Sequence, residues 1–210
     1  MIAVIDYGAG NIQSVVNAFE HIGCSCTVTA DPAILSAASA AVMPGVGSFG
    51  DAMENLRSRN LENPIRDFIG SGKPFLGICL GMQILFGSSE ESRGVRGLDI
   101  LKGEIARIPP GTDSFGARLK IPHMGWNALS LEKPGGLFQG LSDMPFAYFV
   151  HSYYLQAAED IVTARTEYGV SIDAAVQKNN IYACQFHPEK SGDVGLEMLR
   201  NFKEICKEVG

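Results

Sequence analysis

Residues 74–86 read PFLGICLGMQILF, and the pattern changes at Cys79. The residues before the cysteine form an apolar run of strand length, and residues 80–86 begin a helix. Gly77 and Gly81 flank Cys79, which gives the Gly-x-nucleophile-x-Gly pattern of a tight turn between a strand and a helix. We therefore expect a strand, a strained turn that presents the Cys79 thiol, and a helix.

This turn suits a nucleophile for two physical reasons. Side chains at positions 77 and 81 would collide with the neighbouring strand and helix, so both positions favour glycine. The start of a helix stabilises a thiolate, and its free amides make the N–H of Leu80 a natural donor to an oxyanion. The alternative is a buried structural cysteine in a glycine-rich turn.

Strand and helix alternate on the N-terminal side of this unit. We expect strands at residues 1–6, 26–29 and 40–43, and helical stretches after residue 11, after residue 31 and over residues 51–69. Such alternation predicts a mostly parallel sheet with helices on both faces.

The sequence pattern changes after Gly94, where short segments with strand propensity are separated by glycine and proline. These pieces, which we expect to add to the sheet in antiparallel fashion, are residues 103–108, 126–129, 147–154, 161–166, 174–178 and 181–186. A helix over residues 194–209 closes the chain. We therefore predict an α/β fold with one domain, residues 1–210, whose mostly parallel central sheet is flanked by helices and extended by an antiparallel β region.

Composition excludes several classes of protein. The 210 residues are 46% hydrophobic, which supplies a full core and excludes intrinsic disorder. Seventeen basic residues against 23 acidic ones give a net charge of −6, which argues against nucleic-acid binding. No apolar run has the length of a membrane span, and the first residues lack the pattern of a signal peptide, so we expect a cytoplasmic protein.

The five cysteines are odd in number and scattered along the chain, which favours free thiols. Cys24 and Cys26 lack the second pair or the nearby histidines that a zinc site needs, so we expect no metal.

A second chemical segment lies at His187 and Glu189, after the apolar strand predicted at residues 181–186. Residues two apart in extended backbone face the same side, and Pro188 favours a strand end at this point. Cys79, His187 and Glu189 then match a nucleophile, its base and the group that orients the base. A surface histidine and glutamate at a strand terminus is the alternative.

A third segment, Gly45-Val46-Gly47, follows the strand predicted at residues 40–43. Ligands bind at such strand ends in open α/β sheets, and two glycines allow the backbone to turn an amide toward an oxyanion. Taken by itself, this segment is explained more simply as an ordinary strand–helix turn.

One feature favours nucleotide binding instead. Gly8 and Gly10 begin a dinucleotide-binding fingerprint, and Asp31 lies at a suitable distance downstream. Gln13 stands where the fingerprint requires its third glycine, which argues against a nicotinamide cofactor. We predict no cofactor.

Taken together, these segments resemble the class I glutamine amidotransferases, and among them the glutaminase subunits of imidazole glycerol phosphate synthase. The resemblance covers essentially the whole chain. It rests on residues 6–11 (DYGAGN), 44–49 (PGVGSF), 77–86 (GICLGMQILF), 122–127 (PHMGWN), 148–153 (YFVHSY) and 185–191 (QFHPEKS).

The resemblance implies hydrolysis of L-glutamine to glutamate and ammonia by a Cys-His-Glu triad. Cys79 would attack the carboxamide and form a thioester, His187 would transfer protons, and Glu189 would hold the imidazole. Leu80 and the segment Gly45-Val46-Gly47 would supply the oxyanion donors.

The resemblance also implies further substrate contacts and a partner. Gln83, Glu91, Ser152 and Tyr153 would bind glutamine. The partner would be a (β/α)8-barrel cyclase subunit (HisF) that receives the ammonia in histidine biosynthesis, giving a heterodimer without nucleic acid or membrane. The residues that match positions near the subunit interface are Asn11, Trp126, Tyr148 and Lys190.

Three alternatives remain at this point. The chain could be the glutaminase subunit of anthranilate, aminodeoxychorismate or pyridoxal phosphate synthase, although these lack the segment at residues 123–127. A stand-alone cysteine hydrolase would share the elbow and work without a partner. A non-catalytic binding module would share only the fold, which the joint presence of Cys79, His187 and Glu189 disfavours.

Overall fold

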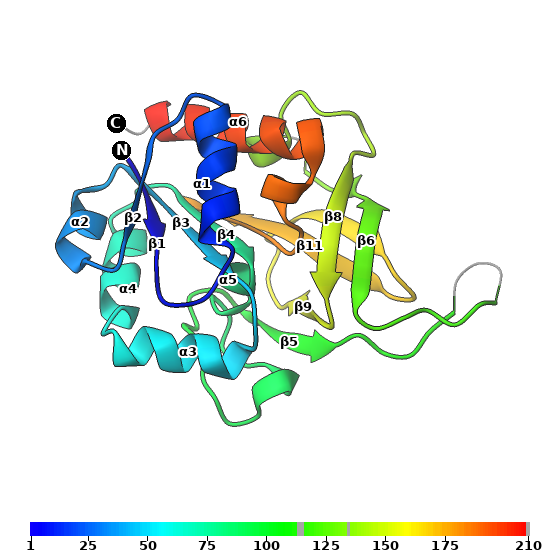
Figure 1. Cartoon of the computed structure of the whole chain (residues 1–210). Coiled ribbons are helices and arrows are strands. Elements are labelled where there is room, and N and C mark those ends of the chain that lie inside the picture. The colour runs from blue at the N-terminus through cyan, green and yellow to red at the C-terminus, as the bar shows by residue number, and fades with distance from the viewer. Residues whose placement is uncertain (113–115, 134, 209–210) are drawn as a thin grey trace.

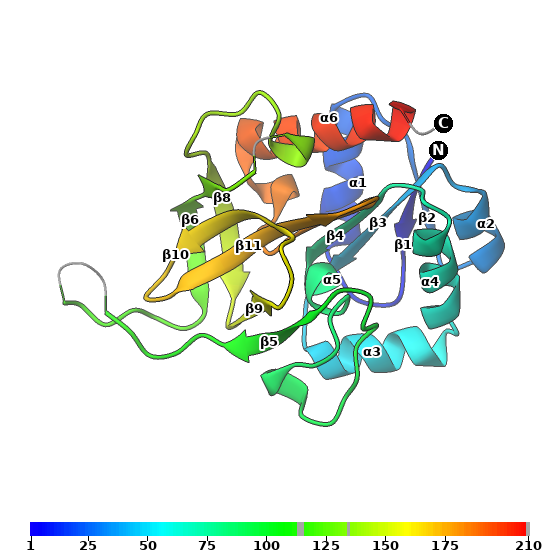
Figure 2. The same ribbon diagram turned by 180° about the vertical axis from the view of Figure 1, so that it is seen from behind.

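The structure, a computed structural model, describes residues 1–112, 116–133 and 135–208. In this part of the chain, ten strands form one sheet and two strands form a separate sheet. Helices cover both faces of the large sheet: α1 and α6 lie on the side seen in Figure 1, and α4 lies on the opposite side, seen in Figure 2.

The first half of the chain builds the parallel part of the large sheet. Its strands are β1 (Ile2–Ile5), β2 (Cys26–Thr29), β3 (Ala40–Gly45) and β4 (Phe75–Cys79). Its helices are α1 (Ile12–His21), α2 (Pro32–Ala37), α3 (Phe49–Ser58), α4 (Glu62–Gly70) and α5 (Leu80–Gln83). The order β2-β1-β3-β4-β12 is parallel throughout, as the alternation predicts.

The second half adds mostly antiparallel strands. They are β5 (Gly103–Arg107), β7 (Ser130–Leu131), β9 (Tyr153–Ala157), β10 (Val162–Glu167), β11 (Ser171–Lys178) and β12 (Ile181–Cys184). The separate sheet pairs β6 (His123–Ala128) with β8 (Phe146–His151). The remaining elements are the turns η1 (Glu90–Ser92), η2 (Gly136–Phe138) and η3 (Pro188–Lys190) and the helix α6 (Gly192–Glu208).

The prediction of an α/β fold with a parallel sheet and an antiparallel extension is confirmed, but some boundaries differ. The helix predicted over residues 51–69 is two helices, because Asn60 adopts a left-handed conformation with φ of 54° between them. The strand predicted over residues 147–154 is β8 and β9, which part at Ser152 and join different sheets. Val209, the predicted end of the last helix, lies outside the described residues.

Alternate residues of the central strands supply two cores. On one face, Ile2 and Val4 of β1 pack with Phe19 of α1 and Phe202 of α6. On the other face, Ala3 and Ile5 join a second cluster that includes side chains of α2, α3 and α4. These two cores pack against both faces of the central strands, including β4, whose last residue is Cys79.

The register places the ends of three segments side by side. Cys79 pairs with Gly45 of β3 on one side, and Ile78 pairs with Cys184 of β12 on the other. The residues that follow Cys184 therefore run past the cysteine.

Candidate active site

The Cys79 turn has the strained geometry that its glycines predict. Its φ of 54° and ψ of −110° are unusual for a residue other than glycine. A Cβ at Gly81 would overlap the carbonyl oxygen of Met43, and one at Gly77 would lie 2.9 Å from the carbonyl oxygen of Gly81. Close backbone contact thus requires both glycines, and Cys79 is held at the start of α5.

His187 and Glu189 form a buried pair. Nδ1 of His187 lies 2.8 Å from Oε1 of Glu189, and both side chains are 2% exposed. The expected contact is present, but its backbone differs from the predicted strand end: β12 already ends at Cys184, and the turn η3 carries Glu189 back toward the imidazole. The proline therefore starts a turn, and strand alternation does not cause the contact.

The surroundings of His187 favour its protonated form. Burial opposes the charged imidazolium, but Cys79 and Glu189 beside the ring outweigh it and raise the pKa of His187 to about 9. Nε2 of His187 is buried without a hydrogen-bond partner among the described residues. This nitrogen is available to the neighbouring cysteine or to a substrate.

These groups open into a cavity of about 320 Å³ at the end of β4. The residues that line the cavity are Val46, Gly47, Cys79, Leu80, Gln83, Glu91, Pro122, Val150, His151, Ser152, Tyr153 and His187. The structure thus brings together most of the residues predicted for the oxyanion and substrate sites. Of the others, Gly45 lies beside Cys79 in the sheet, and Glu189 lies behind His187.

Gln83 and Glu91 reach the cavity in a fixed orientation. Both amide hydrogens of Gln83 are used, because its Nε2 donates to the carbonyl oxygen of Tyr153 at 3.0 Å and to Oε1 of Gln185 at 2.8 Å. Oε2 of Glu91 accepts the N–H of Phe49 at 2.7 Å. The Glu91 carboxylate therefore also holds the beginning of α3.

Sequence reasoning missed four residues at this site. Pro122, Val150 and His151 line the cavity, although none of them carried a recognisable signal beyond its place in a motif. Gln185 is fully buried, and its Nε2 donates to the Cys79 sulfur at 3.5 Å. Only the pairing of β12 with β4 could reveal Gln185, since 106 positions separate it from Cys79.

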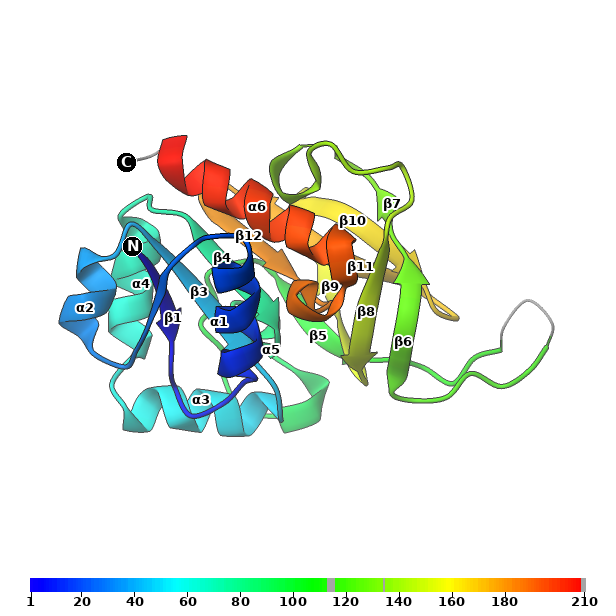
Figure 3. The same ribbon diagram turned by 45° about the horizontal axis from the view of Figure 1, so that its top comes forward.

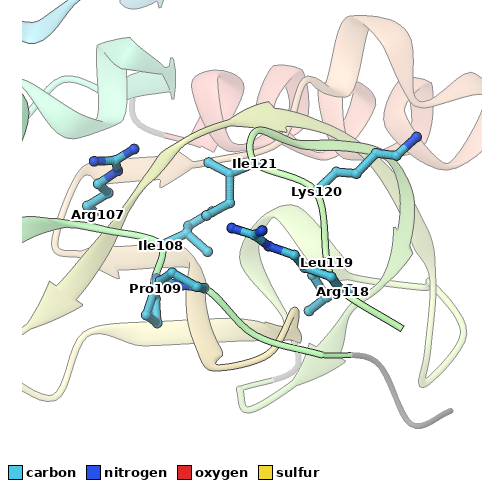
Figure 4. Close-up of a pocket in the computed structure, with 8 residues that line it drawn as sticks. Arg107, Ile108, Pro109, Arg118, Leu119, Lys120 and Ile121 are labelled. Atoms are coloured by element: carbon cyan, nitrogen blue, oxygen red, sulfur yellow. The ribbon is translucent and has the colours of Figure 1, made fainter. Parts of the chain in front are cut away.

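The described residues also form a larger cavity, of about 610 Å³ (Figure 4). The two share a wall, because the N–H of Ile108 in the larger cavity donates to the carbonyl oxygen of Ser152 at 2.9 Å. Arg107, Arg118 and Lys120 border the larger cavity, but Figure 4 shows that their charged ends do not converge. The smaller cavity, with its converging polar groups, is therefore the candidate active site.

Comparison with known proteins agrees with this geometry. The family described as "Glutamine amidotransferase class-I" matches residues 3–205. The chain belongs to this family. An Imidazole glycerol phosphate synthase subunit HisH from Methanothermobacter thermautotrophicus is 53% identical over 207 residues, which cover 99% of this chain and 100% of the relative. HisH from Moorella thermoacetica is 47% identical over 100% of this chain and 97% of the relative.

Solved structures share the fold of this amidotransferase at low sequence identity. One glutamine amidotransferase has a TM-score of 0.75 at 19% identity, and the match covers 99% of this chain and 100% of the other. PurLQS from Thermotoga maritima has a TM-score of 0.72 at 20% identity, and the match covers 97% of each chain.

The four residues predicted near a subunit interface of this amidotransferase lie on β6, on β8, on η3 and at the start of α1. The rings of Trp126 and Tyr148 lie 6.2 Å apart on paired strands, and Trp126 is 56% exposed. Lys190 belongs to η3, which Figure 3 shows between α1 and β8. Asn11 caps α1, with its Oδ1 accepting the N–H of Ser14 at 3.4 Å.

Among the described residues, no helix is both long and apolar enough to cross a membrane.

Proposed function

We propose that this amidotransferase is the glutaminase subunit of an imidazole glycerol phosphate synthase and that residues 1–210 form one catalytic domain. Similarity over the whole chain to relatives named HisH carries the proposal. In this role it hydrolyses L-glutamine and delivers ammonia to a (β/α)8-barrel cyclase subunit. The segment at residues 123–127, which the alternative glutaminase subunits lack, supports this choice among amidotransferases.

In the proposed mechanism, Cys79 is the nucleophile and His187 is its base. Because the Nδ1–H of His187 donates to Glu189, Nε2 can take the thiol proton. The raised pKa of His187 favours this transfer, and the imidazolium then protonates the departing ammonia. Cys79 Sγ forms a bond to the carboxamide carbon (Cδ) of glutamine while the C–N bond to the departing ammonia breaks, which leaves a thioester.

In the second half of the reaction, His187 acts as the base again and Cys79 is the leaving group. Water attacks the thioester carbon, and Nε2 of His187 accepts its proton. The thiolate of Cys79 leaves, and glutamate is released. Leu80 N–H and an amide of the segment Gly45-Val46-Gly47 stabilise the oxyanion in both steps, because the first amides of a helix lack partners within it.

The cavity also accounts for substrate orientation in this proposal. Since both amide hydrogens of Gln83 are committed, only its Oε1 is left to accept from the substrate. Glu91, Ser152 and Tyr153 line the same space and bind the polar groups of glutamine. Asn11, Trp126, Tyr148 and Lys190 contribute to the surface that contacts the cyclase.

Glutamate release from L-glutamine tests the proposal. We would measure the purified chain alone, and then with the cyclase and its nucleotide ligand. Stimulation by the cyclase that disappears in Cys79→Ala, but persists in the control Cys24→Ser, is the expected result. High activity without the cyclase and no change on adding it would contradict the partner assignment while leaving the triad intact.

A further inference from the structure

One hydrogen-bonded chain connects the two-stranded sheet β6–β8 to the Cys79 sulfur. Its first part lies on the buried face of that sheet, where His123 and His151 stand directly opposite each other. Nδ1 of His123 lies 3.0 Å from Nε2 of His151, and Nδ1 of His151 lies 2.9 Å from the carbonyl oxygen of Tyr153.

These contacts fix the direction of every hydrogen bond in the first part. A carbonyl oxygen only accepts, so His151 carries its proton on Nδ1 and accepts on Nε2. His123 then donates from Nδ1, and its Nε2 accepts from Nδ2 of Asn127 at 3.3 Å. Asn127 is itself held, since Nδ2 also donates to the carbonyl oxygen of Glu167 at 2.9 Å.

The second part runs from the Tyr153 carbonyl to the thiol. This oxygen accepts from Gln83, whose other amide hydrogen goes to Oε1 of Gln185. With Oε1 engaged, the Gln185 amide is turned so that Nε2 faces Cys79, to whose sulfur it donates at 3.5 Å. Gln185 is fully buried and Gln83 is 5% exposed, so water does not compete for these bonds.

This series of hydrogen bonds has the Cys79 sulfur at one end and the β6–β8 sheet at the other. Cys79 lies in a strained turn that its surroundings hold in place, and the Gln185 amide donates to its sulfur. At the other end, the outer face of β6–β8 carries exposed apolar side chains, with Met124 62%, Trp126 56% and Phe146 54% exposed. A partner seated on that outer face would press on the strands that carry His123 and His151 on the inner face.

We propose that Gln185 is a positioning residue that orients the Cys79 sulfur. The hydrogen bonds that run from Asn127 through His123, His151, Tyr153 and Gln83 couple the orientation of Gln185 to the position of the β6–β8 sheet. The inference rests on the proposed function, in which Cys79 is the nucleophile. It adds a residue outside the triad and a defined route by which the outer sheet acts on the thiol.

Alkylation of Cys79 by iodoacetamide tests the positioning role without glutamine or a partner. Gln185→Met keeps the approximate volume but removes the donor, so we expect the alkylation rate at fixed pH to fall about tenfold, the scale of one hydrogen bond to an anion. Gln156→Met is the matched control: this glutamine, on β9, donates to the hydroxyl of Tyr154 and stands outside the chain. We expect its rate to match the unmodified protein.

Turnover gives a second readout of the same role. For Gln185→Met we expect kcat of glutamate release to fall about tenfold with KM within about twofold, because the residue acts on the nucleophile and does not contact substrate. An alkylation rate within twofold of the unmodified protein would overturn the inference. If Gln185→Met does not fold, Gln185→Asn, whose shorter amide cannot span the same gap, is judged by the same criterion.

A double-mutant cycle tests the connection to the β6–β8 sheet. His123→Phe keeps the stacking of the ring on Phe149 and Tyr168, whose centroids lie 4.8 and 3.9 Å away, but removes both hydrogen bonds. We expect alkylation to slow about threefold in His123→Phe, and no further loss in the double variant relative to Gln185→Met alone. If the two substitutions slow alkylation independently, so that their effects multiply in the double variant, the proposed hydrogen-bonded connection is refuted.

The outcomes separate this inference from the proposed function. If Cys79 alkylation responds as described but the cyclase mixture releases no glutamate, the chain of contacts stands and the proposed reaction fails. If the cyclase stimulates glutamate release and the Cys79 alkylation rate is the same in Gln185→Met as in the unmodified protein, the proposed reaction stands and the inference fails. Asn127→Ala replaces His123→Phe in the cycle if the latter unfolds.

Discussion

His187 and His151 line the same cavity, yet their pKa values are shifted in opposite directions. The pKa of His187 is raised to about 9, whereas burial lowers the pKa of His151 to about 4 and that of its partner His123 to about 3. All three rings are buried. The difference is therefore not a matter of burial: His187 faces a carboxylate and a thiol, while His151 faces a carbonyl oxygen and another imidazole.

This comparison separates two uses of one residue type. In the proposed mechanism, the histidine paired with Glu189 accepts and returns a proton, as a base must. A histidine held in one neutral tautomer between fixed partners transmits orientation and does not change its charge near neutral pH.

The largest expected difference is between the two histidines in catalysis. His187→Asn removes the base, and we expect glutamate release with the cyclase present to fall about a thousandfold. His151→Asn breaks only the chain of orienting contacts, and we expect a loss of about tenfold. Equal losses in the two variants, with circular dichroism showing both folded, would remove the distinction between the two histidines.

The charge on Glu189 is the next largest contribution. Glu189→Gln keeps the shape of the buried pair and removes the negative charge, so we expect the pKa of His187 to fall from about 9 toward 6.5 and kcat to fall about a hundredfold. Titration of the His187 ring by NMR measures the first effect. A ring that still titrates near 9 would assign the shift to Cys79 instead.

The pH dependence of stability follows with opposite signs for the two pairs. His187 binds its proton more tightly in the folded state than its ordinary value of 6.5, so its stabilisation is complete below pH 6.5 and is lost as the pH rises through about 9. His123 and His151 bind theirs less tightly, so their contribution is complete above pH 6.5 and is lost as the pH falls through about 4 for His151 and about 3 for His123.

Urea unfolding at several pH values measures both slopes. Each proton taken up or released changes the free energy of unfolding by as much as about 1.4 kcal/mol per pH unit. We expect His123→Phe to flatten the acid limb between pH 6.5 and 4 and to leave the alkaline limb unchanged. An acid limb as steep as that of the unmodified protein would mean that His123 does not cause this part of the loss.

The smallest effect on the histidines is expected from the outer face of β6. Trp126→Ala removes a half-exposed ring, so we expect the free energy of unfolding to change by less than about 0.5 kcal/mol and the titration of His187 to remain the same. Binding to the cyclase, measured by titration calorimetry, should weaken at least tenfold because exposed aromatic residues dominate interface energies. Unchanged affinity would place the partner elsewhere.

The sequence predicted best what depends on neighbours along the chain. The Gly77–Gly81 pattern predicts the strained turn at Cys79, and the alternation of strands and helices predicts the parallel half of the sheet. His187 and Glu189 were also within reach, because they are two residues apart, although the turn η3 and not an extended strand joins them.

What was not predictable depends on pairing between distant segments. Gln185 has no local signature, and its meaning comes only from the register of β12 beside β4. The His123–His151 contact needs β6 and β8 to pair in one register. Nothing in the composition near residue 152 shows that one β-prone stretch divides into strands of two different sheets.

The parallel register of β12 on β4 also determines which changes in chain length the molecule tolerates. The site is assembled from segments whose separation along the chain is free, so residues inserted at the exposed loop of Asp143 and Met144 lengthen the chain without moving Cys79 or His187. Deleting a single residue within β12 has the opposite effect. It turns Gln185 and His187 to the other face of the sheet, so a change of one residue there costs more than a long insertion elsewhere.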